Sequence, residues 1–97
     1  MDDFDSAANR KLEELSHFFE DFWPEADVDL FESNLMVNLP GKRQYLINKH
    51  GVTRQIWVSS PFTGAHHFKH KDGSWISTRT NKSIEAFLQH EKNAHAS

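Results

Sequence analysis

The sequence predicts an α+β fold, a two-layer sandwich in which an antiparallel sheet of about six strands is covered on one face by an N-terminal and a C-terminal helix. Segments with helical periodicity stand near both ends of the chain, and short segments with strand periodicity lie between them. The connections between the short segments are only a few residues long, which favours antiparallel pairing because parallel neighbours need long crossovers. The 97 residues are expected to form one domain, residues 1–97.

Apolar residues recur at helical spacing in the first segment. The stripe consists of Phe4, Ala8, Leu12, Leu15, Phe19 and Phe22. Asp5 or Ser6 is expected to cap the start of this helix, because a short polar side chain can accept hydrogen bonds from the first free N–H groups. Pro24 should end the helix near Trp23, since the residue before a proline disfavours helical geometry.

Alternation of apolar and polar residues predicts the strands. They are expected at residues 27–30, 35–39, 43–49, 54–60, 65–70 and 74–78. Turns are predicted at Ser33-Asn34, Pro40-Gly41, His50-Gly51 and Asp72-Gly73, with a loop over residues 61–64. Thr80 or Asn81 should then cap a last helix, in which Ile84, Phe87 and Leu88 form the apolar stripe.

Trp57 stands on the polar side of its predicted strand. Successive side chains of a strand point to opposite faces, so Trp57 shares a face with Gln55 and Ser59, whereas Ile56 and Val58 take the other. Two helices cover only one face of such a sheet. We therefore expect the indole on the face that the helices leave open.

Composition excludes several classes of protein. The chain has no Cys, which rules out disulfides and thiolate metal sites, and no apolar run approaches the ~20 residues of a membrane span. The first residues lack the features of a signal or transit peptide, so the chain is mature, processed or never targeted in this way. No phosphate-binding loop or nucleophile–base motif is present.

Charge is divided unevenly along the chain. Residues 1–32 hold eleven acidic and two basic residues, a net charge of −9, whereas residues 33–97 carry +6. This division predicts an acidic face suited to cations or a basic partner, and a separate face suited to an acidic protein surface. Nucleic acid is not expected as a partner, because the basic residues are scattered and the whole chain is acidic.

An acidic ridge is predicted along the end of the first helix and the first strand. Its candidate metal ligands are Glu13, His17, Glu20, Asp21, Glu25, Asp27 and Asp29. Carboxylate and imidazole groups are ligands for metal cations, so an open ridge of this kind could hold a cation loosely. The alternative is a solubilising helix face and a charged edge strand that resists aggregation.

A polar patch with one large aromatic residue is predicted on the open face. Its candidate partner-binding residues are Asn48, His50, Gln55, Trp57 and His67. Flat patches centred on an aromatic residue are typical of protein-binding hot spots. The alternative is that Trp57 packs under the loop 61–64 or against its cross-strand neighbours.

Three histidines stand close together in the predicted strand 65–70. His66 and His70 should point one way and His67 the other, so they are not expected to converge on zinc. His67 should instead reach the patch around Trp57.

The segment "YLINKHGVTRQIWVSSPFTGAHHF", residues 45–68, and Trp75 after it resemble the central signature of the frataxin family. The upstream "HFFEDF" and "DVDL" look like the end of the frataxin first helix and its first strand, and the resemblance covers roughly residues 12–90. The forms Ile47-Asn48-Lys49 and Ser59-Ser60-Pro61 look more like mitochondrial frataxins and their closest bacterial relatives than those of enteric bacteria.

The resemblance implies an iron-binding protein that assists iron–sulfur cluster assembly by contacting the cysteine desulfurase and its scaffold protein. The cation on the acidic ridge would then be Fe²⁺ or Fe³⁺, loosely bound, with other divalent cations competing. The resemblance also implies that Asn48, Gln55 and Trp57 are contacts to the desulfurase–scaffold complex. Two positions depart from the family pattern, because His50 stands where many members have Gln and His67 where animal frataxins frequently have Arg.

The sequence leaves two alternatives open: a ferroxidase or iron-storage enzyme that oxidises Fe²⁺ with oxygen, and a metal-independent interaction adaptor. The expected location is the mitochondrial matrix or a related organelle, with the bacterial cytoplasm as alternative, and the expected state is a monomer with iron-dependent oligomers possible. Many frataxins have a C-terminal extension that packs between the helices, whereas this chain ends at "QHEKNAHAS". Modest stability is therefore expected, in the lower part of the usual ~5 to 15 kcal/mol.

Overall fold

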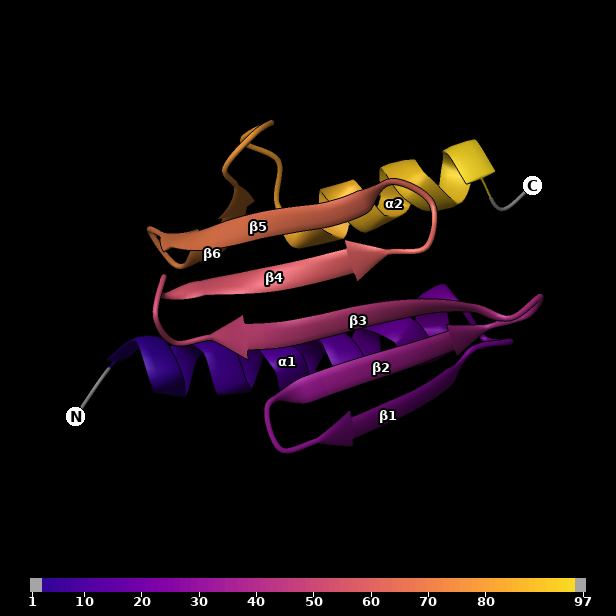
Figure 1. Cartoon of the computed structure of the whole chain (residues 1–97), viewed down its shortest axis with the longest axis horizontal. Coiled ribbons are helices and arrows are strands. Elements are labelled where there is room, and N and C mark those ends of the chain that lie inside the picture. The colour runs from indigo at the N-terminus through magenta and orange to yellow at the C-terminus, as the bar shows by residue number, and fades with distance from the viewer. Residues whose placement is uncertain (1–2, 96–97) are drawn as a thin grey trace.

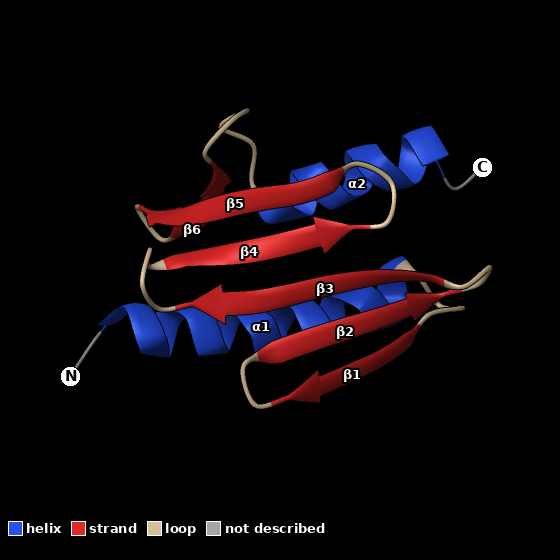
Figure 2. Cartoon of the chain, viewed as in Figure 1, coloured by secondary structure: helices blue, strands red, loops and turns tan. Residues whose placement is uncertain are grey.

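The structure is a computed structural model that describes residues 3–95. Its elements are α1 (Asp3–Phe22), β1 (Asp27–Phe31), β2 (Asn34–Leu39), β3 (Arg43–His50), β4 (Gln55–Ser60), β5 (Gly64–Lys71), β6 (Ser74–Ser77) and α2 (Ile84–His95). The six strands form one antiparallel sheet in the order β1-β2-β3-β4-β5-β6. Both helices lie on the same face of this sheet (Figures 1 and 2), which confirms the predicted two-layer sandwich.

The core lies between the sheet and the helices. Inward-pointing residues of β2, β3 and β4 are buried, among them Val37, Ile47 and Val58. The helical stripes are buried against them, as predicted, except that Phe22 is only partly covered. The opposite face of the sheet has no helix over it (Figure 1), so the side chains that alternate with the core residues point toward solvent.

The first helix starts earlier than predicted. Asp5 and Ser6 lie inside α1, which begins at Asp3, so the predicted cap is wrong. Tertiary packing explains the additional helical residues, because Phe4 is buried with its ring centroid 6.0 Å from that of Trp75. At the other end, Trp23 donates from its backbone N–H to the carbonyl of Phe19 at 2.8 Å.

Turn positions differ from prediction at two hairpins and agree at another. His50, predicted in the turn between β3 and β4, still pairs with Gln55 in the sheet, and the turn covers residues 51–54. The β1–β2 turn is formed by Glu32 and Ser33, one residue earlier than predicted, and Glu32 has a positive φ of 57°. Asn34 is already paired with Phe31 in the sheet. The Asp72-Gly73 turn is confirmed, with φ of 50° and 82° at its two residues, as two-residue hairpins prefer.

The cap of the second helix differs from the two predicted residues. The backbone N–H of Ala86 donates to Ser83 Oγ at 3.1 Å, so Ser83 is the N-cap instead of Thr80 or Asn81. Asn81 has a positive φ of 62° and belongs to the preceding turn. No helix among residues 3–95 is long and apolar enough to cross a membrane.

Candidate partner-binding and metal-binding surfaces

Trp57 lies on the open face of the sheet, between two imidazole rings. In the register of the strands Trp57 is opposite Asn48 on β3 and His67 on β5. The ring centroid of His50 is 3.7 Å from that of Trp57 with 5° between the planes, and that of His67 is 4.4 Å away with 20°. The prediction that the indole occupies the open face is confirmed, and the three rings form one layered stack.

Hydrogen bonds fix the orientation of this stack. Trp57 donates from Nε1 to Gln55 Oε1 at 2.8 Å, and the Nδ1 of His50 is 2.9 Å from Thr53 Oγ1. The cross-strand packing considered as an alternative does occur, but it leaves Trp57, His50 and His67 only partly buried. The indole is therefore held in one position while part of its surface stays accessible.

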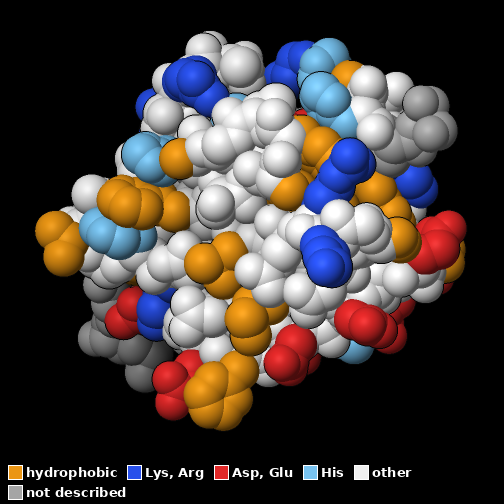
Figure 3. Space-filling view, turned by 45° about the vertical axis from the view of Figure 1, so that its right-hand side comes forward, with side chains coloured by type: hydrophobic (Ala, Val, Ile, Leu, Met, Phe, Trp, Pro, Cys, Tyr) orange, Lys and Arg blue, Asp and Glu red, His pale blue; other side chains and the backbone are white. Residues whose placement is uncertain are grey.

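The acidic ridge is exposed along its whole length. All seven predicted residues are exposed in the structure. His17 and Glu20 pair through Nδ1 and Oε1 at 3.1 Å, and both line a groove of about 240 Å³ between α1 and β1. Asp and Glu side chains gather along the lower edge in Figure 3, and most Lys, Arg and His side chains lie above them.

The edge strand divides the ridge into two parts. Val28 is opposite the buried Val37 and faces α1, so Asp27 and Asp29 point to the open side of β1, away from the helix. Among residues 3–95, no group of three or more His, Cys, Asp or Glu side chains is close enough to hold a metal ion. The ridge is therefore a spread of negative charge instead of a closed coordination cage. Such a surface can hold a cation only loosely, through carboxylate oxygens and retained waters.

The three histidines of β5 diverge, as predicted. His67 stacks on Trp57, His70 stacks on Trp75 with ring centroids 4.8 Å apart, and His66 packs against Phe87 of α2 at 4.4 Å. Each imidazole thus belongs to a different aromatic contact, which agrees with the expectation that they do not converge on zinc.

A buried carboxyl group that is not among the predicted site residues lies between α2 and the sheet. Glu91 is only 1% exposed. Its Oε1 accepts hydrogen bonds of 2.7 Å from Tyr45 and from Ser60, and its Oε2 accepts one from the hydroxyl of Thr63. Burial raises the pKa of Tyr45 above its usual range, and the hydrogen bond to Glu91 raises it further. Glu91 stands three residues beyond Leu88, on the apolar stripe of the helix, and this spacing was the signal in the sequence that it would be buried.

The same cluster extends to His66 and Arg79. The guanidinium of Arg79 donates to Nδ1 of His66 at 2.9 Å, so Nε2 must carry the proton and donate to Thr63 Oγ1 at 2.7 Å. Burial lowers the pKa of His66, and the positive charge of Arg79 lowers it further. An imidazole in this tautomer cannot accept a proton from the Thr63 hydroxyl, so the contact does not activate a nucleophile.

Comparison with known proteins assigns the chain to a family. The family model described as "Frataxin-like domain" matches residues 1–97. This chain belongs to the frataxin family. The frataxin homolog of Saccharomyces cerevisiae, described as mitochondrial, is 35% identical over 80 residues, which are 82% of this chain and 45% of that protein. The iron-sulfur cluster assembly protein CyaY of Vibrio cholerae is 26% identical over 94 residues, which are 97% of this chain and 89% of that protein.

Solved frataxins share the fold. The frataxin of Psychromonas ingrahamii has a TM-score of 0.83 at 20% identity, with 96% of this chain and 89% of that chain covered. Trimeric frataxin from S. cerevisiae, complexed with ferrous iron, has a TM-score of 0.72 at 26% identity, with 97% of this chain and 85% of that chain covered. This frataxin spans about half the length of the S. cerevisiae relative it matches, at 45%.

Proposed function

We propose that this frataxin is an accessory protein of iron–sulfur cluster assembly. It docks on a cysteine desulfurase and its scaffold protein through the surface around Trp57, and it carries loosely bound iron along the acidic ridge. The proposal is supported by family membership and by the name of the V. cholerae relative, an iron–sulfur cluster assembly protein.

The Trp57 stack carries the docking part of the proposal. An aromatic side chain whose position is fixed before binding loses little conformational entropy on association, which favours affinity. Trp57 is fixed by His50, His67 and Gln55 and is still half-buried in the free protein. Neighbouring Asn48 supplies amide groups for hydrogen bonds at the edge of the patch. An indole surrounded by polar groups is the usual composition of a protein-binding hot spot.

The acidic ridge carries the iron part. Exposed carboxylates on α1 and β1 produce a negative potential that attracts cations, and a bound cation relieves the repulsion between them. Iron is the cargo in this proposal, and its weak, open binding is suited to transfer to a partner. The trimeric S. cerevisiae structure complexed with ferrous iron supports iron as the cation.

The compartment and the oligomeric state of this frataxin are proposed from its S. cerevisiae relative. The S. cerevisiae protein, at 35% identity, is described as mitochondrial, and this favours the mitochondrial matrix or a related organelle over the bacterial cytoplasm. A monomer is proposed for the metal-free protein, and the trimeric S. cerevisiae structure makes iron-dependent oligomers the state to examine after iron addition.

The docking part is tested with Trp57→Ala and a matched control, Ser59→Ala, which lies on the same face of β4. Affinity for the cognate desulfurase–scaffold complex is measured by isothermal titration calorimetry, and circular dichroism verifies the fold. Loss of a hot-spot aromatic residue should weaken binding at least about tenfold, whereas the control should bind as the wild type does. Equal affinity of a folded Trp57→Ala variant would refute docking through this face.

The iron part is tested by anaerobic titration of Fe²⁺ into ¹⁵N-labelled protein. Signals of residues 13–29 should change first, and the double substitution Asp27→Asn with Asp29→Asn should weaken the response. Changes confined to other residues would refute iron binding on the ridge.

Two outcomes would favour the alternative functions. No iron response together with intact docking would favour the interaction adaptor. Oxygen uptake that depends on Asp27 and Asp29 would favour the ferroxidase, an alternative that the spread of carboxylates among residues 3–95 does not support.

A further inference from the structure

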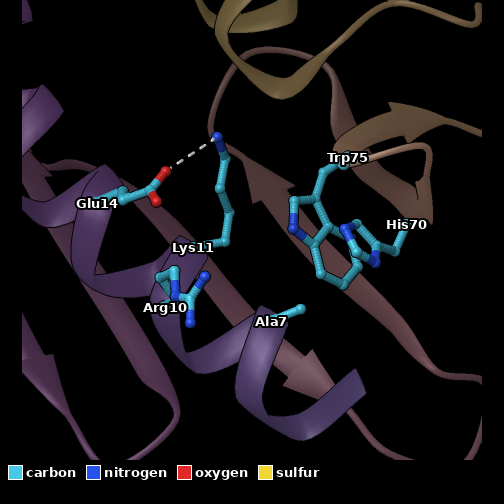
Figure 4. A pocket seen from close by; sticks show the side chains of 7 residues that line it. Ala7, Arg10, Lys11, Glu14, His70 and Trp75 are labelled. Carbon is cyan, nitrogen blue, oxygen red and sulfur yellow. Dashed lines mark ion pairs between the residues drawn. The ribbon is translucent and has the colours of Figure 1, made fainter. Parts of the chain in front are cut away.

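A cavity of about 280 Å³ lies between the first half of α1 and the β5–β6 hairpin. Figure 4 shows Arg10, Lys11 and Glu14 on its helical side and His70 with Trp75 on its sheet side. The groove of the acidic ridge lies on the flank of α1 toward β1, so the cavity is a separate feature. Its volume is far larger than the ~30 Å³ share of one water and is close to the lower end of small-ligand pockets.

Two basic side chains line this cavity, although they belong to a segment of the chain that is otherwise acidic. Arg10 and Lys11 are the only basic residues among residues 1–32, and both line the cavity. The ammonium of Lys11 contacts Glu85 and is 3.6 Å from Glu14 Oε1, so the positive charge of Lys11 is already paired within the chain. Arg10 has no hydrogen-bond or ion-pair partner in the described part of the chain, residues 3–95, so its guanidinium N–H groups are available to a ligand.

The opposite wall is rigid and offers a second hydrogen-bond donor. Trp75 is only 4% exposed and packs on Phe4, while the imidazole of His70 lies on the indole with 25° between the planes. His70 is exposed at the cavity and can donate a hydrogen bond from its ring edge. The two walls come from a helix and a hairpin that are both packed on the core, so their separation is fixed before a ligand arrives.

We propose that this cavity binds a small oxyanion, either a small organic carboxylate or a phosphate. The guanidinium of Arg10 pairs with two oxygens of the ligand, because its fork of N–H groups matches carboxylate and phosphate geometry. His70 donates to a further oxygen from the opposite wall, and Trp75 supplies an apolar floor. Glu14 does not repel the ligand strongly, since its carboxylate is turned to Lys11 (Figure 4). The inference does not depend on the docking or iron proposals.

The test is a titration of the ¹⁵N-labelled protein, residues 1–97, with citrate and, separately, with inorganic phosphate, at ionic strength held constant with NaCl. Either anion should cause saturable shifts confined to residues 7–14 and 70–75. Saturation by only one of the two identifies carboxylate or phosphate as the ligand class. The absence of saturable shifts with both anions overturns the proposal, as do equal shifts around Lys42 and Lys82, exposed cations that do not line this cavity, which would indicate general charge screening.

Two substitutions, each of which removes one positive charge, distinguish anion binding in the cavity from anion binding elsewhere on the surface. Arg10→Gln should weaken anion binding about tenfold, the usual effect of losing a charge-assisted hydrogen bond. Lys69→Gln removes a cation from the open face of β5 and should leave the affinity unchanged. Both side chains are exposed, so both variants should keep the wild-type circular dichroism spectrum. Unchanged affinity for Arg10→Gln, or equal losses in the two variants, overturns the proposal.

Discussion

Each face of the sheet contains a residue of a type that is unusual for its position. On the face toward the helices, Glu91 is a buried carboxyl group in an apolar core, and on the open face Trp57 is the largest apolar side chain among polar neighbours. Strand β4 takes part in both, since Ser60 points inward to Glu91 and Trp57 points outward.

The two environments differ in how much of each side chain stays available to a binding partner. Both oxygens of Glu91 accept hydrogen bonds from hydroxyl groups of the chain, and among residues 3–95 no buried side-chain polar atom lacks a partner. Trp57 has its Nε1 bonded and its ring between two imidazoles, yet it is still partly exposed. An unusual residue is thus structural where the chain completes its interactions, and a candidate for binding where part of its surface stays open.

Substitution of Glu91 should produce the largest effect on folding. Glu91→Ala leaves the hydroxyls of Tyr45, Ser60 and Thr63 without their acceptor, and we expect a loss of about 3 kcal/mol in the free energy of unfolding. Urea denaturation measures it. Gln89→Ala, at an exposed position of the same helix, is the control and should change stability by less than about 0.5 kcal/mol. Similar values for the two variants would contradict a structural role for Glu91.

Substitution of Trp57 should affect folding less than it affects binding. Trp57→Ala removes two ring contacts on the open face but creates no buried cavity, so we expect a loss of about 1 kcal/mol in the free energy of unfolding. The same urea experiment gives this value. A loss as large as that of Glu91→Ala would mean that the stack is chiefly structural. It would contradict the distinction between a structural Glu91 and a binding Trp57.

Acidification should lower the free energy of unfolding through His66. Burial and Arg79 lower the pKa of His66 in the folded protein. Above the ordinary imidazole value of about 6.5 the residue is neutral in both states and contributes no pH dependence. As pH falls through that value, the unfolded chain binds a proton that the folded protein does not, so stability falls.

Urea denaturation between about pH 7.5 and pH 5 measures this dependence. Three charged or titratable groups act on His66, namely Arg79, Glu91 and His67. His66→Gln should reduce the fall in stability, and His17→Gln, at an exposed position of α1, should not. An identical pH profile for wild type and His66→Gln would show that other groups cause the dependence.

The smallest effect on folding is expected at the acidic ridge. Glu20→Gln breaks the exposed pair with His17, whose side chains are 64% and 74% exposed, and should change the free energy of unfolding by less than about 0.5 kcal/mol. The Fe²⁺ response of residues 13–21 should nevertheless decrease. A clear loss of stability in denaturation would show that the ridge supports the fold, against its proposed role.

Much of the architecture could be predicted because periodicity is a local property. Apolar residues at helical or alternating spacing predicted two helices, six strands and the outward direction of Trp57, and each is present. The starts of the helices could not be predicted in the same way. Phe4 extends α1 through contact with Trp75, a residue of β6, and Ser83 replaces the expected caps of α2.

The sequence by itself determined which face of each element is apolar, and therefore the layers of the sandwich and the exposure of the indole. Tertiary structure alone decided the surroundings of Glu91, because its hydroxyl partners lie 46, 31 and 28 positions away along the chain. It also decided that Arg10 and His70 face one cavity from two elements. Contacts of this kind depend on how distant segments pack, and the spacing of neighbouring residues carries no information about them.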